Sequence, residues 1–285
     1  MTPPRPAIGA HVPVSGGLAT KGLAYARAIG AEAVQVFVTN PRGWAPAAGD
    51  PAQDAAFRVA VSEGMPAFVH ASYLVNFGSP DREIVRRSAD SVRHTLQRAA
   101  DIDARGVVVH TGSAVQPARY DAAMASTRTS LLPLLDLGDR LGVRLLLEPT
   151  AGQGQSLCST LDELASFLKA VGRHESLGLC LDTCHAYAAG HDLAARGGMT
   201  RFLNRLDAVL GSVPLLLVHA NDSQDTVGAG KDRHERIGAG HIGEAPFRAM
   251  LRHQILRNAA VVIETPGDRA AHAADLAVLK RLRQR

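Results

Sequence analysis

Six apolar runs of this chain each end in a residue type that binds metal ions. The six residues are His70, His110, Glu148, Asp182, His219 and Glu264. A parallel strand that ends in such a residue presents its side chain at the carboxyl end of the sheet, so six neighbouring strands would bring six ligands to one point. The pattern therefore predicts a metalloenzyme built on a parallel barrel.

The elements that must position these residues follow a repeated pattern. Short β-branched or leucine-rich runs alternate with longer amphipathic stretches, which is typical of βα units. We place eight strands at residues 7–11, 33–38, 66–70, 106–110, 143–148, 177–182, 214–219 and 260–264. One of the intervening helices is predicted over 82–100, with an Arg-rich outer face. We expect an α/β fold, a TIM (β/α)8 barrel with its active site at the C-terminal ends of the strands, in a single domain over residues 1–285.

Composition limits the classes of protein that this chain can belong to. Its 285 residues carry a formal net charge of +4, a mild excess that permits a polyanionic partner without requiring one. The three cysteines form no CxxC pair, and the first residues lack the apolar stretch of a secretory signal. No apolar run is long enough to span a membrane. We expect a soluble cytoplasmic protein.

Two short clusters add candidate ligands. Asp182 and His185 in D-T-C-H are close enough in sequence to serve one site, and Asp232 and His234 in D-R-H can reach one ion from a turn. The candidates then number nine, including five imidazoles. One zinc or manganese ion takes about four to six ligands, so nine residues predict a multinuclear cluster, and the imidazoles favour zinc. Carboxylates such as Glu148 can bridge two ions, an arrangement used in phosphodiester hydrolysis.

Longer motifs around these residues resemble a known family. They are H-A-S-Y-L-V-N at 70–76, E-P-T-A-G-Q-G at 148–154, L-D-T-C-H-A-Y-A-A-G at 181–190, H-A-N-D-S at 219–223, D-R-H at 232–234 and I-E-T at 263–265. The set resembles endonuclease IV, a family of zinc-dependent apurinic/apyrimidinic endonucleases of base-excision repair. The resemblance covers nearly the whole chain, with the motifs in family order.

The resemblance implies a metal centre and a reaction. It implies three zinc ions per chain. The first would be bound by His70, His110 and Glu148, and the second by Glu148, Asp182, His219 and Glu264. The third would be bound by His185, Asp232 and His234. The substrate would be double-stranded DNA containing abasic sites, cut 5′ to the abasic sugar to leave a 3′-hydroxyl and a 5′-deoxyribose phosphate, and blocked 3′ ends are a further possible substrate. Glu148 and Glu264 would be the catalytic carboxylates, although a role for Glu264 as ligand alone is equally compatible with its position. The family also suggests a monomer with no obligate protein partner.

Other residues are candidates for contact with DNA. N-P-R-G-W at 40–44 resembles the family's DNA-penetrating loop, which would place Arg42 in the gap in the base stack. Tyr73 resembles a residue near the flipped nucleotide. The alternatives are an ordinary exposed arginine and a tyrosine that packs at the barrel mouth. The chain departs from the family pattern at Pro149, where Asn is usual, and at Thr111, where Pro is common; Pro149 predicts the loss of one polar contact to the metal ligands.

Two other functional classes compete with this interpretation. A sugar isomerase or epimerase on the same barrel would use Glu148, Asp182, His219 and Glu264 around one or two divalent ions, but it leaves the other five candidates without a shared purpose. A noncatalytic nucleic-acid-binding or metal-storage protein predicts binding without turnover, together with a strongly basic stripe that the sequence lacks.

Overall fold

Eight parallel strands close into a barrel in the computed structural model, which describes residues 5–284. They are β1 (Ile8–His11), β2 (Val34–Val36), β3 (Ala67–His70), β4 (Gly106–His110), β5 (Arg144–Glu148), β6 (Leu177–Asp182), β7 (Leu215–His219) and β10 (Ala260–Ile263). Each strand pairs with the next along the chain, except that β7 pairs with β10, and the barrel closes between β10 and β1. The predicted TIM barrel is confirmed.

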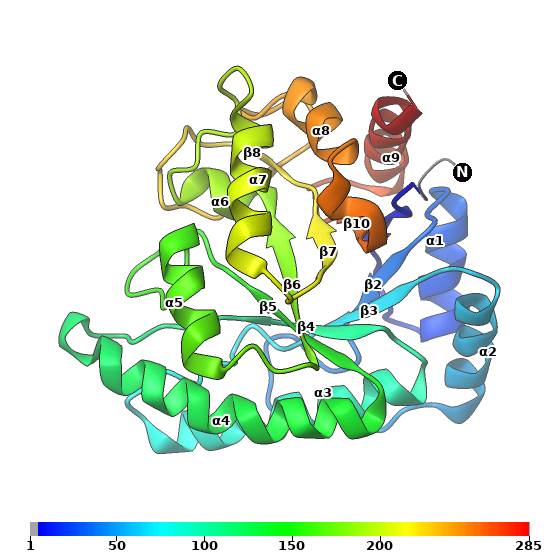
Figure 1. Cartoon of the computed structure of the whole chain (residues 1–285). Helices are drawn as coiled ribbons and strands as arrows, with labels where there is room; N and C mark the ends of the chain where they lie inside the picture. The colour runs from blue at the N-terminus through cyan, green and yellow to red at the C-terminus, as the bar shows by residue number, and fades with distance from the viewer. Residues whose placement is uncertain (1–4, 285) are drawn as a thin grey trace.

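Helices cover the outside of this barrel (Figure 1). They are α1 (Ala24–Ala28), α2 (Pro51–Ser62), α3 (Arg82–Asp101), α4 (Tyr120–Leu141), α5 (Leu161–Val171), α6 (Thr183–Ala188), α7 (Gly198–Leu210), α8 (Glu244–Leu251) and α9 (Arg269–Gln284). Shorter helical turns are η1 (Leu18–Leu23), η2 (Pro117–Arg119) and η3 (Gln254–Asn258). The last helix, α9, packs beside β1 and α1, so the two ends of the described chain lie on the same side of the barrel (Figure 1).

The predicted strands and the predicted helix agree with the structure to within one or two residues at each end. The main differences are β2, which is shorter than predicted, and β10, which ends at Ile263 so that Glu264 is the first residue beyond it. On α3, Arg86, Arg87 and Arg93 are about half exposed and pair with Glu83 or Asp90. The Arg-rich face is therefore a solvated one, as expected.

Alternation along the strands decides which residues face the barrel interior. Eight residues form one hydrophobic cluster there, separate from the larger core beneath the helices: Ala33, Phe68, Val108, Leu146, Cys180, Leu217, Ala260 and Val262. Side chains two residues further along a strand face the same way. Each of the eight strands, or the residue directly after it, therefore places one polar side chain at the mouth of the barrel: His11, Gln35, His70, His110, Glu148, Asp182, His219 and Glu264. We call these eight residues the polar ring.

The long segment after β7 is ordered rather than structureless. Asp222–Ser223 and His234–Glu235 form a short antiparallel pair, β8 and β9, in which Ser223 lies opposite His234. The buried carboxylate of Asp222 accepts hydrogen bonds from the backbone N–H groups of Gly238, Ile242 and Gly243 at 2.8 to 3.1 Å. This carboxylate fixes the path of the chain into α8.

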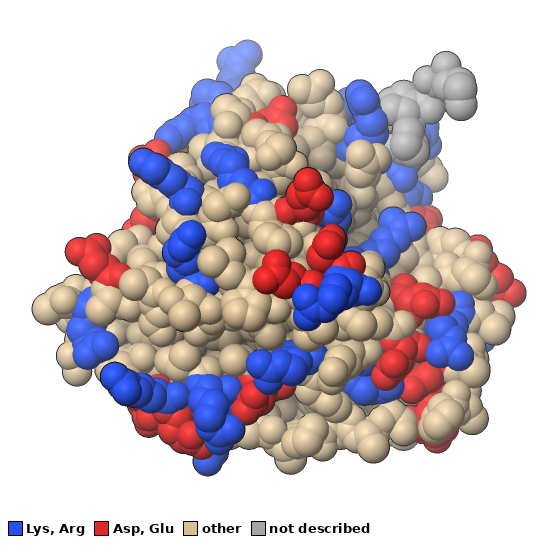
Figure 2. All heavy atoms as spheres, turned by 60° about the horizontal axis from the view of Figure 1, so that its bottom comes forward, with Lys and Arg blue, Asp and Glu red and all other residues tan. Residues whose placement is uncertain are grey.

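The surface shows mixed charge. On the face drawn in Figure 2, Lys and Arg side chains lie among Asp and Glu side chains rather than in one continuous basic field. Among residues 5–284, none of the helices is long and apolar enough to cross a membrane.

Candidate metal centre

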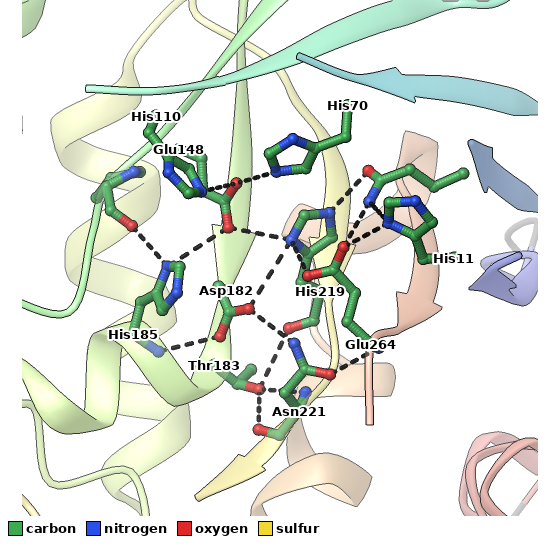
Figure 3. Close-up of polar contacts among 12 residues, drawn as sticks. His11, His70, His110, Glu148, Asp182, Thr183, His185, His219, Asn221 and Glu264 are labelled. Carbon is green, nitrogen blue, oxygen red and sulfur yellow. Dashed lines mark hydrogen bonds and ion pairs between the residues drawn. The ribbon is translucent and has the colours of Figure 1, made fainter. Parts of the chain in front are cut away.

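The end of β6 and the start of α6 bring two candidate ligands together. Asp182 is the N-cap of α6, and its Oδ1 accepts a hydrogen bond from the backbone N–H of His185 at 3.0 Å. Asp182 Oδ2 is left to face the centre, and the first turn of α6 carries the His185 ring toward it (Figure 3). The spacing within D-T-C-H therefore lets Asp182 cap the helix that carries His185, which brings the two side chains together.

Glu148 lies in the middle of the candidate ligands and is almost completely buried, with 1% of its surface exposed. Its Oε2 atom is 3.3 Å from Nε2 of His70 and 3.3 Å from Nε2 of His110. Its Oε1 atom is 3.0 Å from Nδ1 of His219 and 3.4 Å from Nδ1 of His185. One carboxylate thus contacts four imidazoles that come from β3, β4, β7 and α6 (Figure 3).

A second group of ligands lies beside this carboxylate. Asp232 Oδ2 is 3.2 Å from Nε2 of His185, and Asp232 Oδ1 is 3.0 Å from Nε2 of His234. Asp182 Oδ2 lies 3.5 Å from the same His234 nitrogen. The β8–β9 pairing holds His234 in place, which explains how two residues far along the chain reach the end of β6.

Glu264 and His219 form the third part of the centre. Glu264 Oε2 lies 3.4 Å from Nδ1 of His219, whose Nδ1 is also 3.8 Å from Asp182 Oδ2. Glu264 Oε1 faces the other way, where it accepts hydrogen bonds from Gln35 Nε2 at 2.7 Å and His11 Nδ1 at 2.8 Å. His11 was not among the predicted ligands, and its contact with Glu264 makes it a neighbour of one.

Most of the histidines have one nitrogen engaged away from the centre. Nδ1 of His70 donates to the carbonyl of Ala71 at 2.7 Å, and Nδ1 of His234 donates to the carbonyl of Glu264 at 3.1 Å. Nδ1 of His185 donates to the carbonyl of Pro149 at 3.1 Å. Carbonyl acceptors of this kind fix the tautomer of a metal-binding imidazole and leave its other nitrogen free to coordinate. Pro149 thus retains a polar contact with a candidate ligand through its backbone.

The electrostatics of the centre are dominated by attraction between imidazoles and carboxylates. Burial lowers the pKa of His185, but the carboxylates of Asp182, Asp232 and Glu148 outweigh it and raise that pKa to about 10. Burial also lowers the pKa of His234, and Asp182 and Asp232 raise it to about 9. Conversely, burial raises the pKa of Glu148, but the imidazoles of His219 and His110 bring it well below its usual range. Glu148 is therefore ionised at neutral pH, and the imidazoles of His185 and His234 hold protons when no metal is bound.

These residues fit divalent cations. Glu148 Oε2 is buried and accepts no hydrogen bond from any residue between 5 and 284, although two imidazole nitrogens lie 3.3 Å from it. Nitrogen lone pairs that face a carboxylate oxygen repel it unless a cation lies between them. The donor atoms of His70, His110 and Glu148 lie within 4.8 Å of one another, and so do those of His185, Asp232 and His234. Cys180 is also near His219, but burial raises the pKa of its thiol to about 12, so it remains protonated.

The two candidate DNA contacts lie on neighbouring loops. Arg42, between β2 and α2, is exposed, and no hydrogen bond engages its guanidinium among residues 5–284. Tyr73, after β3, is 49% exposed, and its ring centre lies 5.4 Å from that of His70 and 6.1 Å from that of His110. The carbonyl of Pro41 accepts hydrogen bonds from the Tyr73 N–H at 3.0 Å and from the Ser72 hydroxyl at 2.8 Å, which ties the two loops together at the edge of the centre.

Reasoning from the sequence missed three residues that hold the centre. Gln35 is fully buried and contacts both His219 and Glu264. Asn221 donates to Asp182 Oδ2 at 2.7 Å and accepts from the Glu264 N–H at 2.8 Å. The Thr183 hydroxyl donates to the Asn221 carbonyl at 2.6 Å. A glutamine inside the apolar run V-Q-V was the signal for the first, because a polar residue in a buried strand must find partners.

Comparison with known proteins decides between the families that share this barrel. Residues 23–282 match the family model described as xylose isomerase-like TIM barrel. A protein of Streptomyces coelicolor named probable endonuclease 4 is 55% identical over 282 residues, which cover 98% of this chain and 96% of that one. The chain belongs to the endonuclease IV family. The resemblance inferred from the motifs is confirmed, and with it the class of enzyme, a nuclease.

Solved structures agree with this family assignment at the level of the fold. The crystal structure of endonuclease IV from Thermus thermophilus superposes with a TM-score of 0.82 at 35% identity and covers 98% of this chain and 99% of that one. A D-tagatose 3-epimerase-like protein superposes with a TM-score of 0.67 at 17% identity, covering 89% of each chain. That second likeness shows the barrel alone.

Proposed function

We propose that this protein is an apurinic/apyrimidinic endonuclease with three zinc ions per chain. It would hydrolyse the phosphodiester bond 5′ to an abasic site in double-stranded DNA, leaving a 3′-hydroxyl and a 5′-deoxyribose phosphate, and blocked 3′ ends are a second substrate of the same site. One domain over residues 1–285 carries the activity in the cytoplasm. The nine predicted ligands all come from a single chain, which supports a monomer without an obligate protein partner.

One observation carries the proposal: the nine ligands gather into three linked groups around Glu148. Glu148 touches the imidazoles of His70 and His110 on one side and those of His219 and His185 on the other. A carboxylate in this position is suited to bridge two ions. An isomerase site with one or two ions needs only Glu148, Asp182, His219 and Glu264, and offers no role for the group of His185, Asp232 and His234.

Each of the three groups of ligands would hold one zinc ion. His70, His110 and Glu148 would hold one zinc, the Glu148, Asp182, His219 and Glu264 set a second, and the His185, Asp232 and His234 set a third. When bound, zinc would act as a Lewis acid toward a phosphoryl oxygen and would lower the pKa of a water molecule toward neutral pH. The protein's contribution is to fix the ligand nitrogens through the carbonyls of Ala71, Pro149 and Glu264 and to keep Glu148 buried and ionised.

The rim of the centre would select damaged DNA. Arg42 and Tyr73 lie on loops joined at Pro41, and the Tyr73 ring lies beside the imidazoles of His70 and His110, with ring centres 5.4 and 6.1 Å away. An abasic nucleotide lacks base stacking, so its extrusion toward the centre costs less free energy than that of a normal nucleotide. We propose that Arg42 fills the space left in the base stack and that Tyr73 contacts the extruded nucleotide.

The proposal is tested with zinc-loaded protein and a duplex that carries one tetrahydrofuran abasic analogue, beside an undamaged duplex. Because the analogue cannot undergo β-elimination, a single cut that leaves a 3′-hydroxyl identifies hydrolysis. Folded, zinc-loaded protein that leaves the analogue intact would refute the proposal. Manganese-dependent turnover of a ketose by the same preparation would then support the sugar isomerase class.

A further inference from the structure

Two members of the polar ring, Gln35 and His11, are outside the nine predicted ligands. Both lie at the mouth of the barrel, opposite each other in the β1–β2 pairing. Gln35 is fully buried, although it stands between Val34 and Val36 in a strand whose other residues are apolar. Burying a primary amide costs free energy unless each of its polar atoms finds a partner. The partners that Gln35 has found are all groups of the metal centre or next to it.

The amide orientation of Gln35 follows from its neighbours. Its Oε1 lies 2.8 Å from Nε2 of His219, and its Nε2 lies 2.7 Å from Oε1 of Glu264. The reverse orientation would set the amide oxygen against an ionised carboxylate, which cannot donate a hydrogen bond. The amide oxygen therefore accepts from His219 Nε2–H. The remaining lone pair of that imidazole is on Nδ1, which faces oxygens of Glu148, Glu264 and Asp182.

Glu264 is constrained from the same side. Its Oε1 receives Gln35 Nε2–H and, at 2.8 Å, His11 Nδ1–H, while the His11 ring packs 4.4 Å from the ring centre of Phe37. Two donors occupy one carboxylate oxygen, so the other oxygen, Oε2, is the one presented to His219 Nδ1 at 3.4 Å. This asymmetry would make Glu264 a ligand through one atom. It also leaves Oε1 unavailable to accept a proton from a water molecule.

We propose that Gln35 and His11 are positioning residues of the metal centre: Gln35 sets which nitrogen of His219 binds metal, and both residues restrict Glu264 to coordination through Oε2. This inference rests on the metal centre of the proposed function but not on the DNA substrate. It also resolves the two roles open to Glu264 in favour of ligand. Loss of such outer contacts typically lowers metal affinity or activity by about 10- to 100-fold.

The test measures metal binding directly. Gln35→Met removes both amide contacts at similar volume, and Gln35→Glu keeps the acceptor for His219 but removes the donor to Glu264. Leu146→Met is the matched control, because Leu146 lies in the apolar interior beneath the polar ring. Zinc affinity by chelator competition should fall by about 10- to 100-fold in Gln35→Met and stay unchanged in the control. The visible absorption of the cobalt-substituted protein should shift in both Gln35 variants.

A double-mutant cycle separates positioning from simple stabilisation. His11→Phe removes one donor to Glu264 Oε1 and should weaken zinc binding in the wild-type background but not in a Glu264→Gln background. Gln35 and His11 variants with lower thermal stability but wild-type zinc affinity and cobalt spectra would overturn the inference. Wild-type protein that binds the metal but leaves abasic DNA uncut would refute the proposed function. The zinc-affinity and cobalt measurements would still test the inference, because they do not depend on DNA.

Discussion

Replacing Glu148 with glutamine gives the sharpest test of the ligand arrangement. The substitution keeps the volume of the side chain but removes a charge that lies 3.0 to 3.4 Å from nitrogens of four imidazoles. Two of the three proposed zinc groups depend on this carboxylate. The group of His185, Asp232 and His234 keeps its own carboxylate, at 3.2 and 3.0 Å. Metal content should therefore fall from about three ions per chain to about one.

The expected effect on catalysis follows from the lost ions. Metal ions supply several kcal/mol of transition-state stabilisation in phosphoryl chemistry. Taking this loss as about 5 kcal/mol, the single-turnover rate of incision should fall by roughly three to four orders of magnitude. The rate is measured on the tetrahydrofuran duplex at saturating enzyme, and bound metal is measured by mass spectrometry on the same preparation.

The matched control is Glu32→Gln. Glu32 also pairs with cations, Arg283 at 2.6 Å and Lys280 at 3.5 Å, but it precedes β2 and so lies at the opposite end of the barrel from the polar ring. This variant should retain about three ions and the wild-type rate. A Glu148→Gln protein that keeps all its zinc and cuts at the rate of the control would refute the bridging role.

Three further perturbations test other parts of the structure. Zinc loading at pH 7.5 should release protons, because the pKa values of His185 and His234 are raised to about 10 and about 9; calorimetry in buffers of different ionisation enthalpy measures the release, and its absence would contradict the electrostatics described above. Raised pKa values stabilise the metal-free fold fully below about pH 6.5, and this contribution is lost as pH rises through 9 to 10, so the Tm of metal-free protein should fall more between pH 7 and 10 than that of zinc-loaded protein. Arg42→Ala should weaken binding to the abasic duplex by about tenfold in fluorescence anisotropy and leave binding to undamaged duplex nearly unchanged, whereas equal affinity for the abasic duplex would make Arg42 an ordinary surface residue. Asp222→Ala should lower the free energy of unfolding by about 3 kcal/mol or more in urea, since it leaves several buried N–H groups unpaired; Asp225→Ala, which removes an exposed pair with Arg233, is the control and should change it little.

Six of the eight members of the polar ring were predictable because each stands at the end of an apolar run. A strand that ends in His or Glu gives a signal that depends only on local sequence, and the βα repeat then fixes where the strand ends meet. His185, Asp232 and His234 were predictable for a different reason, their short spacing within D-T-C-H and D-R-H. The barrel itself followed from the alternation of element types.

The remaining contacts depend on geometry that a linear pattern does not carry. Gln35 is in the middle of an apolar run, and the register that pairs it with His11 of β1 places it at the mouth of the barrel. The support that Asn221 gives to Asp182 and to Glu264 joins positions 39 and 43 residues apart. The loss of an Asn side-chain contact at Pro149 stays a prediction, while the backbone carbonyl of Pro149 contacts His185, because a main-chain acceptor does not depend on the side chain.

The closure of the polar ring has a consequence for how the protein is made. Its members are spread from His11 to Glu264, and the last of them meets the first only when β10 pairs with β1. A polypeptide still emerging from the ribosome, or one cut before Glu264, lacks part of the centre however well its earlier strands have formed. A metal ion that binds only the finished ring would, in turn, stabilise the closed barrel over open forms, and more so the tighter it binds. A copy in which β10 has not yet paired with β1 therefore lacks the complete centre and is expected to be inactive.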